Sequence, residues 1–409
     1  MKALKVILLI FLAYALIPYL ICPVYKFPAA EKFQGGKIWN PYSQPASSKW
    51  YRCNFHLHTR SYAGVTSGKD SAEDAFRAYK MLGYDIASIS NYMSISDSSY
   101  DKSCFIPAYE HGYGIQKTHH LCIGANRTTW IDFPVYQFKD QKQFIINLLK
   151  GDNEIVSLAH PAFAYGYTID EMKYLTNYDC LEVLNHYRTS EQHWDAALSA
   201  GRIAYLEAGD DTHDISKTRQ VARCFNMINA DSFTREGIVD ALKTGRNYGV
   251  LFAKLQIRDE TYENKAARIS KLPSLLRVEV TNGVLEVAVN EEADEIKFIG
   301  QDGASRKAAK STSASSYAII PEDTYIRTEI TFKDGTKFYL NPVFRYSGDK
   351  PQGTKPATVD IFRTILYRGL LFCLLIIIVV ACIRFQKKRR MKNEALLDVK
   401  ERGTGMKDA

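Results

Sequence analysis

Two long apolar runs, one near each end of the chain, constrain its fold more than any other feature. Residues 6–25 contain no charged side chain, and a helix of that length can cross a bilayer core of about 30 Å. Residues 369–383 form the second run, which reaches a similar length if the Arg368 side chain extends to the interface. We therefore predict a transmembrane helix at each end. Buried core helices are one alternative. A cleaved signal peptide is another for the first run, but Pro18, Pro23 and the lack of a clean cleavage site favour an uncleaved anchor.

The positive charge of the chain lies almost entirely beside these runs. The net charge is +8 at pH 7, and residues 384–409 hold nine Lys or Arg against four Asp or Glu. Four more basic residues flank the apolar runs: Lys2, Lys5, Arg363 and Arg368. The rest of the chain therefore carries a net charge of −1. Because basic flanks stay in the cytoplasm, both termini are predicted to be cytoplasmic. The body between them is predicted to be extracytoplasmic, in a periplasm or at the cell surface.

Between the apolar runs, residues 50–252 alternate short β-rich segments with helical patterns. Repeated βα units predict a parallel sheet, open or closed into a barrel, with chemistry at the C-terminal ends of its strands. Helices are predicted at 71–82, 141–150, 169–175, 191–200 and 234–244. Strands are predicted at 52–56, 86–89, 154–159, 181–184, 203–206 and 224–228.

Residues 255–347 have strand patterns without helical ones. Asn282-Gly283 and Asp334-Gly335 each predict a hairpin turn, and the Ser-, Ala- and Lys-rich residues 302–316 predict an exposed loop. We therefore predict a small all-β sandwich. The predicted order is a transmembrane anchor (1–25), a linker (26–49), an α/β domain (50–252), the β-sandwich (255–347), a linker (348–360), a transmembrane helix (361–384) and a basic cytoplasmic tail (385–409).

All nine histidines lie between residues 56 and 213. His56-Leu57-His58 ends a predicted strand, and side chains at i and i+2 of a strand share a face, so both imidazoles can reach one point. Other ligand-type residues also lie at the ends of predicted strands: Glu110, His119, His120, His160, Asp210, Asp211 and His213. Imidazoles with carboxylates suit Zn, Mn or Fe, and a shared carboxylate can hold two such ions about 3.5–4 Å apart. Core histidines without a metal are the alternative, but that interpretation leaves these coincidences unexplained.

In this ordered set of motifs the sequence resembles the PHP family of metal-dependent phosphoesterases, which includes histidinol phosphatases and polymerase-associated domains. The resemblance covers about 50–252. Its motifs are HxH at 56–58, PxxE at 107–110, HH at 119–120, AHP at 159–161 and GxDxH at 209–213. The resemblance implies a distorted seven-stranded (β/α) barrel with up to three metal ions.

Carried over by motif, the resemblance also implies the ligands. The first metal would be held by His56, His58, Glu110 and Asp211, and the second by Glu110, His120 and His160. His213 matches a third-metal position. His111, His119 and His193 are left outside the ligand set. Glu182 is expected to orient its neighbours rather than bind metal.

Two departures from the family pattern affect the third position. The chain has Asn91 and Tyr92 where the family usually has an Asp-His pair, and Ala63 with Gly64 where it often has a ligand. We therefore predict a dinuclear site of two divalent ions (Mn, Zn or Fe) and no organic cofactor. His213 is then free to bind a substrate phosphate or a leaving group.

These ligands predict phosphoester hydrolysis by a hydroxide that two cations activate at neutral pH. His213 or His186 is predicted to protonate the leaving alkoxide, and Arg60 and Arg188 to bind phosphate oxygens, with surface arginines as the alternative. The predicted function is a membrane-anchored, extracytoplasmic phosphoesterase acting on a small phosphorylated compound. The alternative is a catalytically degenerate barrel that serves as a ligand-binding or cell-surface interaction module. The nearly neutral body argues against a nucleic-acid partner.

Overall fold

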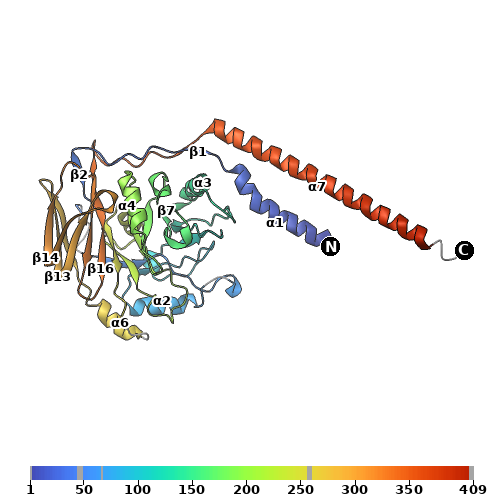
Figure 1. Cartoon of the computed structure of the whole chain (residues 1–409). Coiled ribbons are helices and arrows are strands. Elements are labelled where there is room, and N and C mark those ends of the chain that lie inside the picture. The colour runs from blue at the N-terminus through green and yellow to red at the C-terminus, as the bar shows by residue number, and fades with distance from the viewer. Residues whose placement is uncertain (1, 44–48, 66–67, 256–259, 405–409) are drawn as a thin grey trace. The chain divides into compact units, whose positions relative to one another are not determined.

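The computed structural model of the chain describes residues 2–43, 49–65, 68–255 and 260–404 (Figure 1). It divides into two units, one formed by Met1–Lys26 with Val359–Ala409 and the other by Phe27–Thr358. Parts of the predicted anchor (1), the first linker (44–48), the predicted sandwich (256–259) and the tail (405–409) lie outside the described residues.

The terminal unit contains two helices, α1 (Lys2–Ile21) and α7 (Ile361–Thr404), besides the short strand β1 (Tyr25–Lys26). Arg368 Nη2 donates to the Ile21 carbonyl at 2.5 Å, and the Val24 amide donates to Thr364 Oγ1 at 3.0 Å. Within the described residues, one stretch, Ile361–Met391, is long and apolar enough to cross a membrane. Among the described residues of α1, Phe11–Ile21 forms a shorter apolar stretch. Of the two predicted membrane helices, the C-terminal one therefore meets this criterion of length and hydropathy within the described residues.

The strands of the body form two main sheets. The five-stranded sheet has the order β5 (Ala108–His111), β6 (His120–Ala125), β7 (Asn153–Leu158), β8 (Cys180–Asn185), β9 (Tyr205–Gly209). The ten-stranded sheet has the order β12 (Leu275–Thr281), β13 (Val284–Ile299), β15 (Tyr325–Thr331), β16 (Lys337–Tyr346), β11 (Asn247–Leu251), β10 (Cys224–Ile228), β3 (Tyr51–Asn54), β4 (Ile86–Ala87). In addition β14 (Ser305–Ala318) pairs with β13, and β2 (Lys37–Trp39) pairs with β16. The short strand β17 (Thr358–Val359) follows the body sheets.

Single backbone bridges join the edges of the two sheets. Leu57 pairs with Thr212 beyond the ends of β3 and β9, and Tyr92 pairs with Glu110 between β4 and β5. Strands β3 to β9 thus follow one another in space, but in the part of the chain described here no continuously paired barrel forms. The sequence predicts a parallel sheet, but the five-stranded sheet is mixed. Strand β5 pairs antiparallel with β6, and β6 pairs antiparallel with β7. No helix lies between β5 and β6, so the chain reverses direction in a short connection and the two strands run antiparallel.

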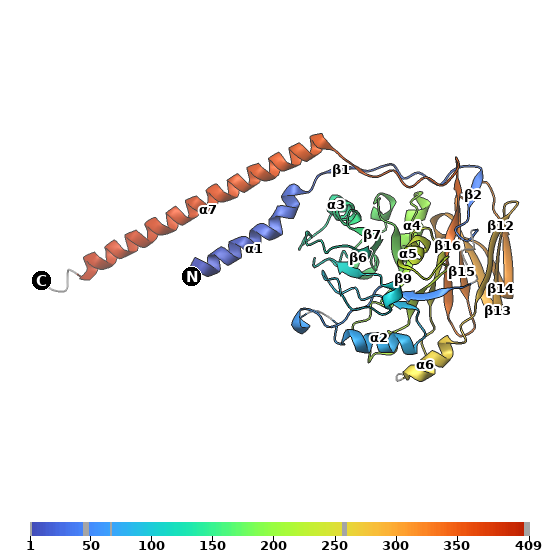
Figure 2. The ribbon, with the colours of Figure 1, turned by 180° about the vertical axis from the view of Figure 1, so that it is seen from behind.

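Helices cover these sheets: α2 (Ala72–Met81), α3 (Lys139–Lys150), α4 (Glu191–Ser199), α5 (Arg235–Lys243) and α6 (Tyr262–Ile269). Ser71 caps α2, because its side chain accepts a hydrogen bond from the Asp74 amide. Trp194, Leu206 and Ile238 belong to one buried hydrophobic cluster, which packs α4 and α5 against β9. α2 and α6 lie side by side (Figures 1 and 2). The predicted helix at 169–175 is only a 3₁₀ turn, Glu171–Lys173.

The C-terminal strands, which the sequence predicts as a small sandwich, pair with strands of the preceding α/β region. Tyr248 of β11 pairs with Leu340 of β16, so these strands continue the ten-stranded sheet. Both predicted hairpins form, but residues 302–316 lie largely within the strand β14 rather than in a loop. Small polar side chains gave β14 the composition of a loop, whereas backbone pairing with the long β13 makes it a strand.

Candidate metal centre

Buried polar side chains converge where β3, β5 and β9 meet. His56 and His58 follow β3, Glu110 lies in β5, and Asp211 follows β9. Leu57, between the two histidines, is also fully buried on the opposite side of the chain. The bridge between Leu57 and Thr212 holds these segments together, with the His58 amide donating to the Thr212 carbonyl at 2.9 Å.

The distances within this four-residue group (His56, His58, Glu110, Asp211) suit one ion. Glu110 Oε2 lies 3.4 Å from His56 Nε2 and 3.0 Å from His58 Nε2. Asp211 Oδ1 lies 3.4 Å and 3.3 Å from the same nitrogens. Four ligands at roughly 2.0–2.1 Å from a tetrahedral ion are themselves about 3.3–3.4 Å apart. The group therefore has the spacing of a metal site.

The same four atoms also lack hydrogen-bond partners. His56 Nε2, His58 Nε2, Glu110 Oε2 and Asp211 Oδ1 are buried, and none forms a hydrogen bond among the described residues. Buried polar atoms are costly when unpaired, and here all four point at one another. A divalent cation would satisfy them together.

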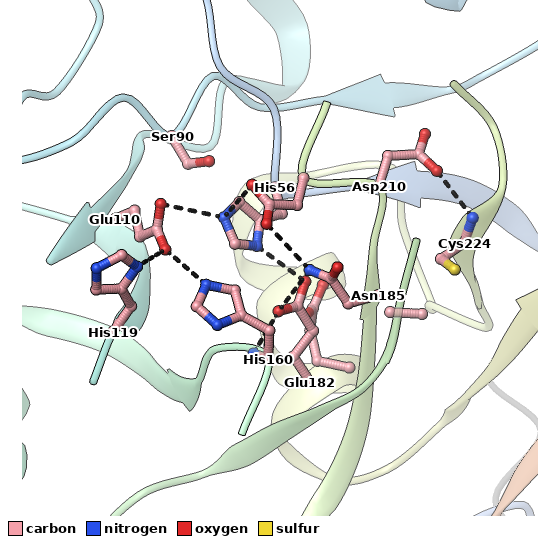
Figure 3. A network of polar contacts seen from close by, with 12 residues as sticks. His56, Ser90, Glu110, His119, His160, Glu182, Asn185, Asp210 and Cys224 are labelled. Carbon is pink, nitrogen blue, oxygen red and sulfur yellow. Dashed lines mark hydrogen bonds and ion pairs between the residues drawn. The ribbon is translucent and has the colours of Figure 1, made fainter. Parts of the chain in front are cut away.

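A second, three-residue group (Glu110, His119, His160) adjoins the first. Glu110 Oε1 lies 2.5 Å from His119 Nδ1 and 3.0 Å from His160 Nε2, as Figure 3 shows. Glu110 thus presents one carboxylate oxygen to each group. This is the arrangement expected of a carboxylate that bridges two ions.

The second group contains His119, which lies beside Glu110, and not the predicted ligand His120. His120 Nε2 instead contacts the Tyr167 hydroxyl at 2.9 Å. Consecutive residues of an extended chain point to opposite faces, so only one of the two histidines can face Glu110. The HH motif gave no signal that could decide between them.

Glu182, at the centre of β8, contacts the side chain of one of these residues and the backbone of another, as expected of a residue that orients its neighbours. Its Oε1 lies 2.8 Å from His56 Nδ1, and its Oε2 accepts from the His160 amide at 2.7 Å (Figure 3). Asn185, which the sequence analysis missed, donates to Glu182 Oε2 and Asp211 Oδ2 at 3.2 and 3.3 Å. Because Glu182 binds Nδ1 of His56, it leaves Nε2 aimed at the four-residue group.

The backbone at the site is strained. His160 has φ of 30° and Asp211 has φ of 50°, in the left-handed region that L residues rarely adopt. Such residues cost about 1–3 kcal/mol each and cluster at functional sites.

Gly209 provides a test of this packing. A Cβ there would lie 2.5 Å from His56 Cβ and 2.6 Å from Glu182 Oε1. We expect Gly209→Ala to destabilise the fold by about 1–3 kcal/mol and to weaken metal binding, because it displaces the His56–Glu182 pair. Thermal unfolding and metal analysis would check this, with Gly36→Ala as the control, since nothing lies within 4 Å of its Cβ. Equal behaviour of the two variants would contradict the geometry.

Protonation of the site is coupled to its carboxylates. Burial by itself lowers the pKa of His58, but Asp211 and Glu110 raise it above its usual value. The pKa of His56 is raised well above its usual value by Asp211, Glu182 and Glu110, again against the effect of burial. Conversely, His119 and His56 hold the pKa of Glu110 well below its ordinary value although burial raises it. Protons thus stabilise the ion-free site below pH 6.5, and this stability is lost as the pH rises through the raised pKa values.

Metal binding is therefore expected to strengthen with pH. An ion must displace the protons of His56 and His58, which changes the apparent affinity by roughly tenfold per pH unit for each proton released. We expect the rise in melting temperature on adding Mn²⁺ to be larger at pH 8 than at pH 6. A rise that is equal at both pH values, or larger at pH 6, would contradict the assignment of these imidazoles as ligands.

Of the predicted catalytic residues, two histidines border the site. His213 stacks on His58 with ring centroids 4.2 Å apart, and its Nδ1 donates to the Asp211 carbonyl at 2.9 Å. His186 Nδ1 donates to the Asp210 carbonyl, and burial lowers the pKa of His186 to about 4. A neutral ring that donates through Nδ1 presents an acceptor at Nε2. Both rings donate through Nδ1, and the acid role predicted for one of them stays a prediction.

The predicted phosphate-binding arginines, Arg60 and Arg188, both have exposed side chains, and Arg60 Nη2 donates to the Lys69 carbonyl at 2.9 Å. Their role in binding phosphate stays a prediction, as does the alternative of surface arginines.

The residues that depart from the family pattern lie in different surroundings. Asn91 Oδ1 accepts from the Thr59 amide at 2.8 Å. The Tyr92 ring lies beside those of His58 and His119, with centroids 4.6 and 5.4 Å away. Ala63 lies in an exposed turn.

Comparisons with known proteins give limited information. No protein-family model and no curated protein matches the chain. Among solved structures, it is similar to a two-domain protein containing a predicted PHP-like metal-dependent phosphoesterase from Bacteroides vulgatus ATCC 8482. The TM-score is 0.38 and the identity 14%, over 80% of this chain and 92% of that chain. This similarity is too low to assign a function, so the functional inference rests on the residues of the site.

Proposed function

We propose that the chain is a membrane-anchored, metal-dependent phosphoesterase with a dinuclear centre. The observation that carries this proposal is the set of four unpaired buried atoms in the four-residue group, joined to the three-residue group by Glu110. The proposed ligands are His56, His58, Glu110 and Asp211 for one ion and Glu110, His119 and His160 for the other. We propose Mn, Zn or Fe, because these ions suit imidazoles with carboxylates.

Two such ions would lower the pKa of water and balance the charge that develops on phosphoryl oxygens. The residues of the chain would bind these ions and orient the ligand side chains. Glu182 keeps His56 in the tautomer with Nε2 unprotonated, and burial keeps bulk water from the ligand atoms. His213, stacked on His58, offers Nε2 as a proton acceptor at the edge of the site.

The substrate and location form the finer part of the proposal. A small phosphorylated compound is proposed, since the nearly neutral body lacks the charge for binding a nucleic-acid backbone. Both apolar runs are proposed to cross the membrane, with their basic flanks in the cytoplasm, and residues 50–252 and 255–347 are proposed to lie outside the cytoplasm. The exposed stretch Ile361–Met391 and the basic residues that follow residue 383 support this topology.

Hydrolysis by the purified full-length protein tests the proposed activity. Loaded with Mn²⁺ or Zn²⁺, it is expected to hydrolyse p-nitrophenyl phosphate or bis-p-nitrophenyl phosphate. His160→Ala is expected to lower the rate at least about 100-fold, because loss of even an outer partner costs 10–100-fold. His193→Ala, on α4 and outside both groups, is the matched control. No hydrolysis of either ester, or an unchanged rate for His160→Ala, would favour a ligand-binding module instead.

A further inference from the structure

An apolar patch is exposed on the body, on the connection from β5 to β6 and on the connection from β6 to α3. It consists of Ile115, Val135, Tyr136 and Phe138, and the first and last of these side chains are 77% and 63% exposed. The Ile115 amide donates to the Pro134 carbonyl at 3.1 Å, and the rings of Tyr136 and Phe138 lie 4.7 Å apart. Isolated apolar side chains are ordinary on a protein surface, whereas a contiguous group marks an interaction surface.

Exposed apolar side chains are distributed unevenly over the rest of the body as well. On its described part, the large ones lie, with three exceptions, in the segments 62–65, 113–138 and 165–187. The exceptions are Met81, Leu276 and Ile320. The three segments follow His58, Glu110 and His160 in the chain, all of which belong to the metal groups. The apolar surface of the body is therefore concentrated on loops that follow residues of the metal groups.

The chain enters the body beside this patch. Lys139, which follows Phe138 at the start of α3, places its Nζ 4.7 Å from the centre of the Phe27 ring. Phe27 comes six residues after Ile21, the last residue of α1, and six residues can span at most about 22 Å. The start of α3 is therefore tied closely to the end of the first apolar run.

The chain also leaves the body along α3. The Ala357 amide donates to Thr176 Oγ1 at 2.9 Å, and the Thr176 amide donates to Gln143 Oε1 of α3 at 3.0 Å. Ala357 comes four residues before Ile361, the first residue of α7, and four residues can span at most about 14 Å. Both connections to the apolar runs are thus fixed on the helix that begins at the patch.

We propose that the patch of Ile115, Val135, Tyr136 and Phe138 binds the surface of the lipid bilayer in which the chain is anchored. This inference rests on the anchoring proposed above. Tyrosine rings are enriched at membrane interfaces, and apolar side chains there enter the boundary between headgroups and acyl chains. A bilayer is the occupant that fits best, because the chain is covalently tied to it by two short connections that meet the body at α3.

Quenching of tryptophan fluorescence by labelled lipid tests this contact in the full-length protein. The chain has four tryptophans, none of them in the apolar runs: Trp39, Trp50, Trp130 and Trp194. Because Trp130 is exposed, the parent protein carries Trp130→Phe. Phe138→Trp then places a reporter in the patch, with Ile115→Trp as a second reporter. Leu276→Trp is the matched control, because Leu276 is 65% exposed on β12 and outside the patch.

Each variant is reconstituted into phosphatidylcholine vesicles, with and without a nitroxide near the headgroup end of the acyl chains. After subtraction of the parent emission, the Phe138→Trp signal is expected to fall at least about twofold in the labelled vesicles, because the side chain enters the bilayer boundary. The Leu276→Trp signal is expected to stay unchanged. Thermal unfolding checks that the variants fold, as expected for exposed positions.

Flotation of the vesicles after alkaline extraction shows first whether the chain is anchored. A chain that does not float would refute the anchoring and this proposal with it. In a chain that floats, equal quenching of Phe138→Trp and Leu276→Trp, or quenching of neither, would overturn this proposal alone. Protection of the Phe138→Trp emission from aqueous iodide without quenching by lipid would assign the patch to a second copy or another protein, and would also overturn it. Hydrolysis is not measured, so failure of the proposed phosphoesterase activity leaves this contact standing.

Discussion

Glu110→Gln is expected to remove both ions and to lower any phosphoesterase activity by more than about 100-fold. Glu110 Oε2 contacts His56 and His58, and Oε1 contacts His119 and His160. The amide keeps the size of the side chain, but it loses the negative charge and replaces one acceptor with a donor. A single isosteric change therefore disrupts both groups at once.

Metal analysis and the rate of ester hydrolysis measure this effect. Glu236→Gln is the matched control, because Glu236 is exposed in the first turn of α5. A Glu110→Gln protein that retained both ions and full activity would show that Glu110 is not the bridge.

His119→Ala and His120→Ala are expected to differ sharply although the two residues are adjacent. His119→Ala removes a ligand of the three-residue group and should lower activity by about 100-fold or more. His120→Ala removes the partner of the Tyr167 hydroxyl and should cost about 1–3 kcal/mol of stability, with activity kept within tenfold below the melting temperature.

The comparison of these variants needs kcat/KM, metal content and thermal unfolding of each. The opposite order, with His120→Ala losing the metal and His119→Ala keeping it, would restore the ligand set that the sequence motif implies.

Local sequence patterns predicted those residues of the two groups that come directly after a strand. His56 and His58 share a face because two positions separate them, and Asp211 follows a strand of ordinary composition. Nothing local distinguishes His119 from His120, since that choice depends on which face of the chain meets β5 and β7. Asn185 was missed because its role depends on contacts with Glu182 and Asp211 across the site.

The fold, like the site, was predicted from the sequence only where local signals determine it. The turn residues Asn282-Gly283 predicted the hairpin between β12 and β13. The union of the C-terminal strands with β11 depends on long-range pairing that periodicity does not encode. The strand β14 escaped prediction because its small polar residues contribute backbone pairing rather than a buried face.

The central claim is that this chain binds two divalent ions through Glu110 and its histidine and aspartate neighbours. Elemental analysis of the purified full-length protein, reconstituted with Mn²⁺ or Zn²⁺ and freed of loosely bound metal, tests it directly. We predict two ions per chain; fewer than one tightly bound ion per chain would contradict it.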